Sequence, residues 1–179
     1  MADGDVLSAL DLKAARLRLL VFDVDGVLTD GTVMLHGDGS ESKLFHIRDG
    51  AGLVWAQRAG LMTGLISART SPATTLRAAQ LAVPIVVQGA ASKLQAYEQI
   101  LREQQLEDHE VGFMGDDLLD LPVLARAGLS AAPADAAAEV LARVDWVSTA
   151  PGGRGAAREF VEFVLRAQGA WERIVSDYS

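Results

Sequence analysis

Several features that define particular classes of protein are missing from this sequence. None of its 179 residues is cysteine, which excludes disulfide bonds, thiolate metal sites and cysteine nucleophiles and fits a reducing compartment such as the cytoplasm. No run of about 18 apolar residues occurs, so we expect no membrane-spanning helix. Positive charge is scarce, and the net charge of −8 argues against a nucleic-acid partner. Residues 1–16 lack the apolar segment of a secretory signal, and we interpret them as a short leader with a helix over 7–15.

Short apolar runs alternate with segments of helical character along the chain. Strands are predicted from Leu19 onward and over residues 61–67, 83–87, 110–114, 129–131 and 145–147. Helices are predicted over residues 50–59 with Asp49 as N-cap, from Ser71, from Ser92, and over 118–126 and 155–167. This alternation predicts an α/β fold, a single-domain Rossmann-like parallel sheet with helices on both faces. Residues 33–35 and 44–45 flank a turn-rich segment and predict a protruding β-hairpin.

The most informative stretch begins as a buried strand and ends in two carboxylates. Asp23 and Asp25 follow the apolar run from Leu19 and are followed at once by Gly26. Alternation along a strand places both carboxylates on one face, where they repel unless a cation or a proton intervenes. Gly26 allows a sharp exit from the strand and a close approach of the backbone to a ligand. Taken alone, the motif fits equally well a strand that ends in an acidic turn.

Three further strands of the predicted sheet also end in polar residues. Ser67 follows the second strand, Lys93 begins the helix after the third, and Asp116 and Asp117 follow the fourth. Each has an ordinary interpretation, as a local cap, a surface lysine or a solvated helix start. In open α/β sheets, however, ligands bind beyond the carboxyl ends of the strands, where these residues converge. Three carboxylates, a hydroxyl and a lysine there predict a site for Mg²⁺ and a phosphoryl group.

These motifs resemble those of the haloacid dehalogenase superfamily of phosphotransferases. The matching stretches are residues 21–31, Ser67, Lys93 and residues 115–120. The resemblance implies that Asp23 is the nucleophile that forms an aspartyl-phosphate and that Asp25 is the general acid and then the general base. It implies that Mg²⁺ is bound by the Asp23 carboxylate, the backbone carbonyl of Asp25 and Asp116. Ser67 and Lys93 would then stabilise the phosphoryl oxygens.

Residues 18–168 are similar, more specifically, to the 3-deoxy-D-manno-octulosonate 8-phosphate (KDO 8-phosphate) phosphatase family. Residues 45–50, 67–72, 115–122 and 152–159 carry this resemblance. It implies substrate contacts at Asp25, His46, Ile47, Arg48, Asp49, Gly50, Val54, Arg69, Arg77 and Lys93. Arg69 and Arg77 suit the carboxylate of a sugar acid, although Arg77 is equally well interpreted as a solvated helix residue. Ala68 departs from the glycine usual in the family, which bears on the placement of Arg69.

Nothing in the sequence leaves room for a cap domain, so residues 1–179 are predicted to form a single capless phosphatase domain with a C-terminal tail at 169–179. Residues 30–67 hold only a hairpin and a helix. Water must still be excluded from an aspartyl-phosphate, so we expect a neighbouring subunit to close the site. The hairpin is placed for such an interface, and the resembling family is tetrameric. The tail has an apolar stripe at Trp171, Ile174, Val175 and Tyr178, which packs either on its own subunit or on a neighbour. The glycine loop at 152–155 is either an anion site or a plain connection.

The sequence hypothesis is a Mg²⁺-dependent phosphatase of KDO 8-phosphate in lipopolysaccharide precursor synthesis. The alternatives are a phosphatase of a nonulosonate 9-phosphate and a non-catalytic module that stimulates a sugar-nucleotide transferase. The complete set of Asp23, Asp25, Lys93 and Asp116 disfavours the module. A phosphomutase would need a cap to reorient its intermediate.

Overall fold

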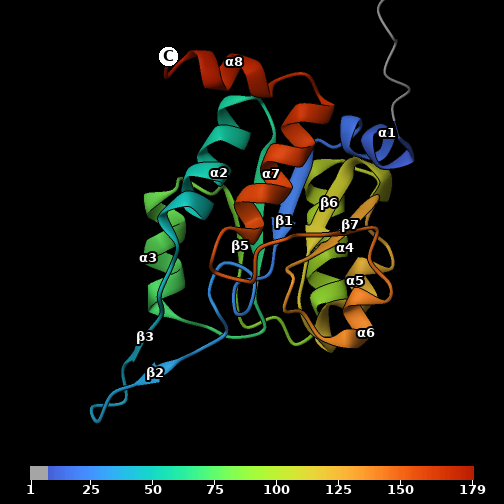
Figure 1. Ribbon diagram of the computed structural model, residues 1–179. Helices are drawn as coiled ribbons and strands as arrows, with labels where there is room; N and C mark the ends of the chain where they lie inside the picture. Colours follow the sequence, from blue (N-terminus) through green and yellow to red (C-terminus); the bar gives the residue numbers. More distant parts are fainter. Residues whose placement is uncertain (1–7) are drawn as a thin grey trace, which may run out of the picture.

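A computed structural model describes residues 8–179 of the chain (Figure 1). The predicted leader falls partly on residues 1–7, which lie outside the described residues. Its helix is present as α1, Ala9–Ala15, with the hydroxyl oxygen of Ser8 accepting a hydrogen bond from the Asp11 amide. In residues 8–179, no helix is both long and apolar enough to cross a bilayer.

A six-stranded sheet forms the centre of the molecule, in the order β5-β4-β1-β6-β7-β8, and every neighbouring pair is parallel. The strands are β1 Leu19–Phe22, β4 Met62–Ile66, β5 Ile85–Val87, β6 Val111–Met114, β7 Leu129–Ala132 and β8 Trp146–Val147. All four residues of β1 are fully buried, because it lies between β4 and β6 with helices on both faces. Its side chains alternate between two apolar clusters, with Leu20 and Phe22 in one and Leu19 and Val21 in the other.

Helices cover both faces of the sheet, which confirms the predicted α/β fold (Figure 1). One face carries α1, α2 Ile47–Arg58 and α7 Ala156–Ala167, and the other carries α4 Lys93–Gln104, α5 Leu121–Leu124 and α6 Ala138–Leu141. The remaining helices are α3 Pro72–Gln80, α8 Trp171–Ser176 and the 3₁₀ turns η1 Asp108–Glu110 and η2 Leu118–Asp120. The predicted helix over 118–126 is therefore shorter and starts as a 3₁₀ turn. Within residues 8–179, no cap domain is inserted.

A β-hairpin projects from the body of the molecule, as predicted (Figure 1). It consists of β2 Met34–Leu35 and β3 Glu41–Ser42, with Met34 opposite Ser42 and Leu35 opposite Glu41. The prediction of residues 44–45 as the second arm is wrong. Leu44 is 76% exposed, and Phe45 instead packs against the apolar cluster under α2. An apolar pair beside a turn has the same pattern in either role, so the arm could not be placed from hydrophobicity alone.

Asp49 does not cap α2, contrary to the prediction. The N-cap position of α2 belongs to His46, and Asp49 lies in the first turn with its side chain almost fully buried. The Asp49 carboxylate accepts hydrogen bonds from the backbone amides of Gly155 (3.1 Å) and Arg158 (2.9 Å). These amides belong to the start of α7, whose first-turn donors lack partners within their own helix. Asp49 therefore caps a helix that begins more than a hundred residues later.

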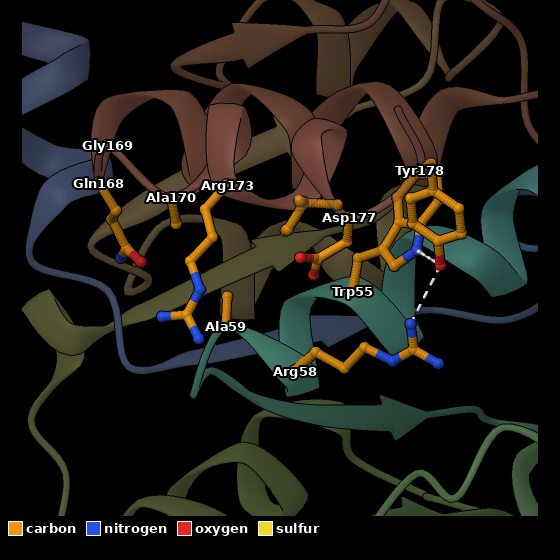
Figure 2. A pocket seen from close by; sticks show the side chains of 10 residues that line it. Trp55, Arg58, Ala59, Gln168, Gly169, Ala170, Arg173, Asp177 and Tyr178 are labelled. Carbon is orange, nitrogen blue, oxygen red and sulfur yellow. Dashed lines mark hydrogen bonds between the residues drawn. The ribbon is translucent and has the colours of Figure 1, made fainter.

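The C-terminal tail packs on its own chain at the end of the molecule opposite the hairpin (Figure 1). Trp171 and Ile174 of α8 are buried, and the Trp55 ring lies 5.7 Å from the Trp171 ring and 5.8 Å from the Tyr178 ring. Figure 2 shows the Tyr178 hydroxyl oxygen accepting hydrogen bonds from the Trp55 indole (3.1 Å) and from Arg58 (3.0 Å). A pocket of about 310 Å³ lies between this tail and α2, with no lining residue in common with the carboxyl ends of the strands.

Candidate active site

The polar residues at the strand ends converge, as the sequence predicted. A cavity of about 160 Å³ opens beyond the carboxyl ends of β1, β4 and β6. Its lining residues are Asp23, Asp25, Ser67, Ala68, Arg69, Lys93, Asp116, Asp117, Leu119 and Asp120. Convergence follows from topology, because three adjacent parallel strands end at the same edge of the sheet. The helix that begins at Lys93 brings its lysine to the same edge.

Lys93 lies at the centre of the charged cluster. Its ammonium nitrogen is 2.8 Å from Asp23 Oδ1 and 2.6 Å from Asp120 Oδ1, and its side chain is almost fully buried. Ser92 caps α4, as predicted, by accepting a hydrogen bond from the Gln95 amide (3.3 Å). Burial disfavours the charged lysine, but attraction to Asp23 and Asp120 outweighs it and raises the pKa of Lys93. A buried cation is thus fixed between two carboxylates.

The carboxylates of this cluster are crowded. Burial raises the pKa of Asp23 to about 6, and repulsion from Asp120 adds to the rise while Lys93 opposes it. Burial also raises the pKa of Asp116 to about 8, with repulsion from Asp23 and Asp120 contributing. In the protein alone, a proton relieves this repulsion at neutral pH. A divalent cation would relieve it equally well.

The donor set fits a hard cation. Oxygen atoms of Asp23, Asp116 and Asp120 all lie within 4.8 Å of one another. Asp116 Oδ1 is buried and has no hydrogen-bond partner, as expected of an oxygen reserved for a ligand. A Cβ at position 26 would overlap with Asp116 Oδ2, so glycine is required where the chain leaves β1 with φ +97°. Clustered carboxylate oxygens are the ligands that Mg²⁺ prefers.

Asp25 is oriented differently from Asp23. Its Oδ1 lies 2.6 Å from the Lys43 ammonium, and its Oδ2 lies 3.9 Å from Nε of Arg69. The Asp25 carboxylate is therefore outside the cluster formed by Asp23, Asp116 and Asp120. This orientation is compatible with the role implied by the resemblance, in which only the backbone carbonyl of Asp25 contacts the metal. That contact stays a prediction.

Ser67 and Arg69 both line the cavity. Ser67 is buried, and its hydroxyl oxygen accepts a hydrogen bond from the Arg69 amide (3.1 Å), so it also acts as a local cap. The Arg69 guanidinium lies 2.7 Å from Glu41 Oε2 of the hairpin and remains half exposed. Ala68 also lines the cavity, so the methyl group in place of glycine is compatible with an Arg69 that reaches the mouth.

The other predicted substrate contacts lie away from this cavity in the single chain. None of the following residues of α2 and its N-cap lines the cavity: His46, Ile47, Arg48, Gly50 and Val54. The Asp49 carboxylate is already engaged by the start of α7. The Arg77 guanidinium of α3 is partly buried, lies against Gly50 of α2 and is 3.4 Å from Gln80 Oε1. Substrate binding by these residues stays a prediction.

Two charged residues that contact the predicted site residues were not predicted from the sequence. Asp120 bonds Lys93, and its other oxygen accepts hydrogen bonds from the amides of Asp116 (3.0 Å) and Asp117 (3.3 Å). Its signal was present in the acidic stretch 115–120, which was assigned a role only through Asp116. Lys43 is the second, and a single lysine after a turn gives no local sign of its contact with Asp25.

The glycine loop at 152–155 supports the turn after β1. The Gly153 amide donates to the Val27 carbonyl (2.8 Å), and the Gly152 amide donates to Asp135 Oδ1 (2.8 Å). A Cβ at Gly152 would overlap with the carbonyl oxygen of Gly26. Because Asp49 already binds the Gly155 amide, the geometry favours a structural connection over an anion site.

Comparison with known proteins agrees with this geometry. Residues 66–159 match the haloacid dehalogenase-like hydrolase family. The chain is 39% identical over 166 residues to the 3-deoxy-D-manno-octulosonate 8-phosphate phosphatase KdsC of Escherichia coli strain K12, covering 93% of this chain and 88% of that protein.

Two solved structures share the fold. One is the Moraxella catarrhalis 3-deoxy-D-manno-octulosonate 8-phosphate phosphatase in complex with a magnesium ion, a phosphate ion and a KDO molecule. Its TM-score is 0.93 and its sequence identity is 30%, and the match covers 95% of this chain and 98% of that chain. The other is the cobalt-bound form of the Haemophilus influenzae deoxy-D-mannose-octulosonate 8-phosphate phosphatase, with TM-score 0.86, 35% identity, and coverage of 89% and 93%. The chain therefore belongs to the haloacid dehalogenase-like hydrolases, within the family of 3-deoxy-D-manno-octulosonate 8-phosphate phosphatases.

Proposed function

We propose that this chain hydrolyses KDO 8-phosphate to the free sugar acid and inorganic phosphate, with Mg²⁺ bound by Asp23, Asp116 and the backbone carbonyl of Asp25. The observation that carries the proposal is the buried contact of Lys93 with Asp23 and Asp120, beside Asp116, in a cavity at the strand ends. The Moraxella relative, which binds magnesium, phosphate and KDO, supports the choice of cation and substrate.

The reaction proceeds in two displacements. A carboxylate oxygen of Asp23 attacks phosphorus, the bond to the sugar oxygen breaks, and the Asp25 carboxyl gives its proton to the leaving alkoxide. In the second step the Asp25 carboxylate takes a proton from water, the hydroxide attacks phosphorus, and the bond to Asp23 breaks to release phosphate. Each residue then returns to its starting state.

The remaining residues of the site act through charge and position. Lys93 and Ser67 hold the phosphoryl oxygens as negative charge shifts among them. Bound Mg²⁺ supplies positive charge that offsets the repulsion between the incoming phosphate and the carboxylates. Arg69, half exposed at the mouth, binds the carboxylate of the sugar acid, which a guanidinium matches with two hydrogen bonds.

Residues 1–179 form one capless phosphatase domain, with residues 1–16 as leader and 169–179 as tail. A homotetramer closes the active site, and this is supported by large exposed side chains at the hairpin and cavity mouth, namely Met34, Leu35, Leu44, Leu118 and Leu119. The enzyme acts in the cytoplasm in lipopolysaccharide precursor synthesis, without a nucleic-acid or membrane partner.

Magnesium-dependent phosphate release from a panel of sugar phosphates tests the proposal. We expect KDO 8-phosphate to give the highest kcat/KM and a chelator to abolish turnover. Equal or faster turnover of a nonulosonate 9-phosphate would replace the substrate while leaving the chemistry intact. Absence of turnover on every phosphate, in a folded protein supplied with Mg²⁺, would favour the non-catalytic module.

A further inference from the structure

Lys43 is an unusual residue outside the known motifs of the site. It follows β3 of the hairpin, and its side chain has no exposed surface. A buried ammonium is costly unless it is paired. Its ionic contacts among residues 8–179 are Asp25 Oδ1 at 2.6 Å and Glu41 Oε1 at 4.0 Å. The burial of this lysine therefore depends mainly on the carboxylate of the proposed acid and base.

The contact also distinguishes the two oxygens of Asp25. Oδ1 accepts the hydrogen bond from Lys43, whereas Oδ2 is buried without a hydrogen-bond partner. The charged groups that face Asp25 are Lys43 from the hairpin and Arg69 from the loop after β4, and both of these also lie near Glu41. Of these, only Lys43 lies within hydrogen-bond distance. Oδ2 is thus left as the oxygen that can exchange a proton with the leaving group or with water.

We infer that Lys43 is a positioning residue for Asp25, and this inference rests on the proposed function. Lys43 fixes the carboxyl group so that Oδ2 faces the reacting oxygen. It also stabilises the negative charge on Asp25 once the proton has passed to the leaving alkoxide, because its ammonium lies 2.6 Å from Oδ1. Through Lys43 the hairpin contributes directly to proton transfer.

Leaving groups of different basicity separate this role from a merely structural one. A sugar alkoxide needs a proton as it departs, whereas p-nitrophenolate leaves without one. Phosphorylation of Asp23 by p-nitrophenyl phosphate therefore needs no acid, but hydrolysis of the aspartyl-phosphate still needs Asp25 as base. We expect Lys43→Met to lower kcat for KDO 8-phosphate by about tenfold to a hundredfold, a fraction of what general acid–base catalysis contributes.

With p-nitrophenyl phosphate the same variant should show a full pre-steady-state burst of p-nitrophenolate followed by a slowed steady state. Lys43→Arg, which keeps the charge, should restore part of the rate. Lys13→Met is the matched control, because Lys13 also pairs with an aspartate, Asp145, but is 44% exposed and far from the cavity. Lys43→Gln, which keeps a hydrogen-bond donor, is measured in parallel in case the methionine variant fails to fold.

The inference is overturned if burst and steady state fall together, as loss of active protein would cause, or if the neutral variants keep the wild-type kcat on KDO 8-phosphate. Inactivity of the wild type on both substrates would instead refute the proposed function. If the wild type is active and the Lys43 variants have the same activity, only the role of Lys43 is refuted.

Discussion

Replacing Asp120 by alanine tests whether the charged cluster is organised as the structure indicates. Asp120 Oδ1 lies 2.6 Å from the Lys93 ammonium, and Oδ2 accepts hydrogen bonds from the backbone amides of Asp116 and Asp117. Removing one partner of a buried ion pair costs about 3–5 kcal/mol, and an unsatisfied buried donor costs about 1–3 kcal/mol. Lys93 keeps Asp23 as a partner, and the cavity admits water. We therefore expect Asp120→Ala to lower the free energy of unfolding by about 3 kcal/mol, near the lower end for a broken buried pair.

Asp120→Asn separates charge from hydrogen bonding. Asparagine retains an oxygen that can accept a hydrogen bond from one of the two amides, so we expect the free energy of unfolding to fall by only about 1–2 kcal/mol. Both variants also remove a negative charge that helps to raise the pKa values of Asp23 and Asp116. Because Lys93 then has only Asp23 to fix it, we expect kcat to fall by about tenfold to a hundredfold, as for the loss of an oriented electrostatic group.

Urea denaturation and steady-state phosphate release measure these effects. Asp117→Ala is the matched control, because Asp117 is exposed and its side chain accepts only local hydrogen bonds within the first turn of η2, among them one from the Leu118 amide (2.8 Å). Such a cap is worth about 1 kcal/mol. An Asp120→Ala variant as stable and as active as Asp117→Ala would show that Asp120 does not hold Lys93 in solution, and the geometry argued for the cluster would be wrong.

Three further substitutions or conditions probe the same site. Asp23→Asn should abolish turnover, with beryllium fluoride stabilising the wild type against heat but not the variant; a wild-type rate in the variant would exclude the covalent route. The metal-free fold holds a proton on Asp116, whose pKa is raised to about 8, and the unfolded chain loses that proton near its ordinary pKa of 3.8. Stability should therefore fall as pH rises between these values, by up to about 1.4 kcal/mol per pH unit, and the rise in Tm caused by Mg²⁺ should be larger at pH 8 than at pH 6. A pH-independent rise, or one retained in Asp116→Asn, would contradict this. Gly152→Ala should lower both kcat and stability, because the added Cβ would overlap with the Gly26 carbonyl. Gly37→Ala serves as the control, because its added Cβ would meet no atom within 4 Å. Equal behaviour of the two variants would exclude a supporting role for the glycine loop.

The parts of the site that could be predicted from sequence are those set by short-range pattern and sheet topology. The apolar run from Leu19 identified β1, and the parallel arrangement brought Asp23, Ser67, Lys93 and Asp116 to one cavity. None of these placements required knowledge of a specific side-chain contact. Each followed from where a strand ends and where its neighbour ends.

The errors concern residues whose partners lie far away in the chain. Asp49 looks like the cap of its own helix, yet it bonds Gly155 and Arg158, because the packing of α2 on α7 offers it free amides. Lys43 resembles any surface lysine until the hairpin brings it to Asp25, eighteen residues earlier. Rules for helix capping and charge pairing consider only partners that are close in sequence. Tertiary packing also brings distant residues together and so determines which contacts form.

Charge balance in the cavity links these observations. Five aspartates line it, opposed by Lys93 and Arg69 at its wall and by Lys43 behind Asp25. Arg69 also pairs with Glu41, so negative charge is in excess around the cavity. Two carboxyl groups of the cavity have raised pKa values, Asp23 at about 6 and Asp116 at about 8, and both belong to the cluster that fits a hard cation. Protons and a divalent cation are therefore alternative ways to neutralise the same two groups. Without the cation, Asp23, the proposed nucleophile, would be mostly protonated below about pH 6 and would then be a poor nucleophile. In that pH range, the crowding that favours metal binding would therefore also make activity depend on the metal.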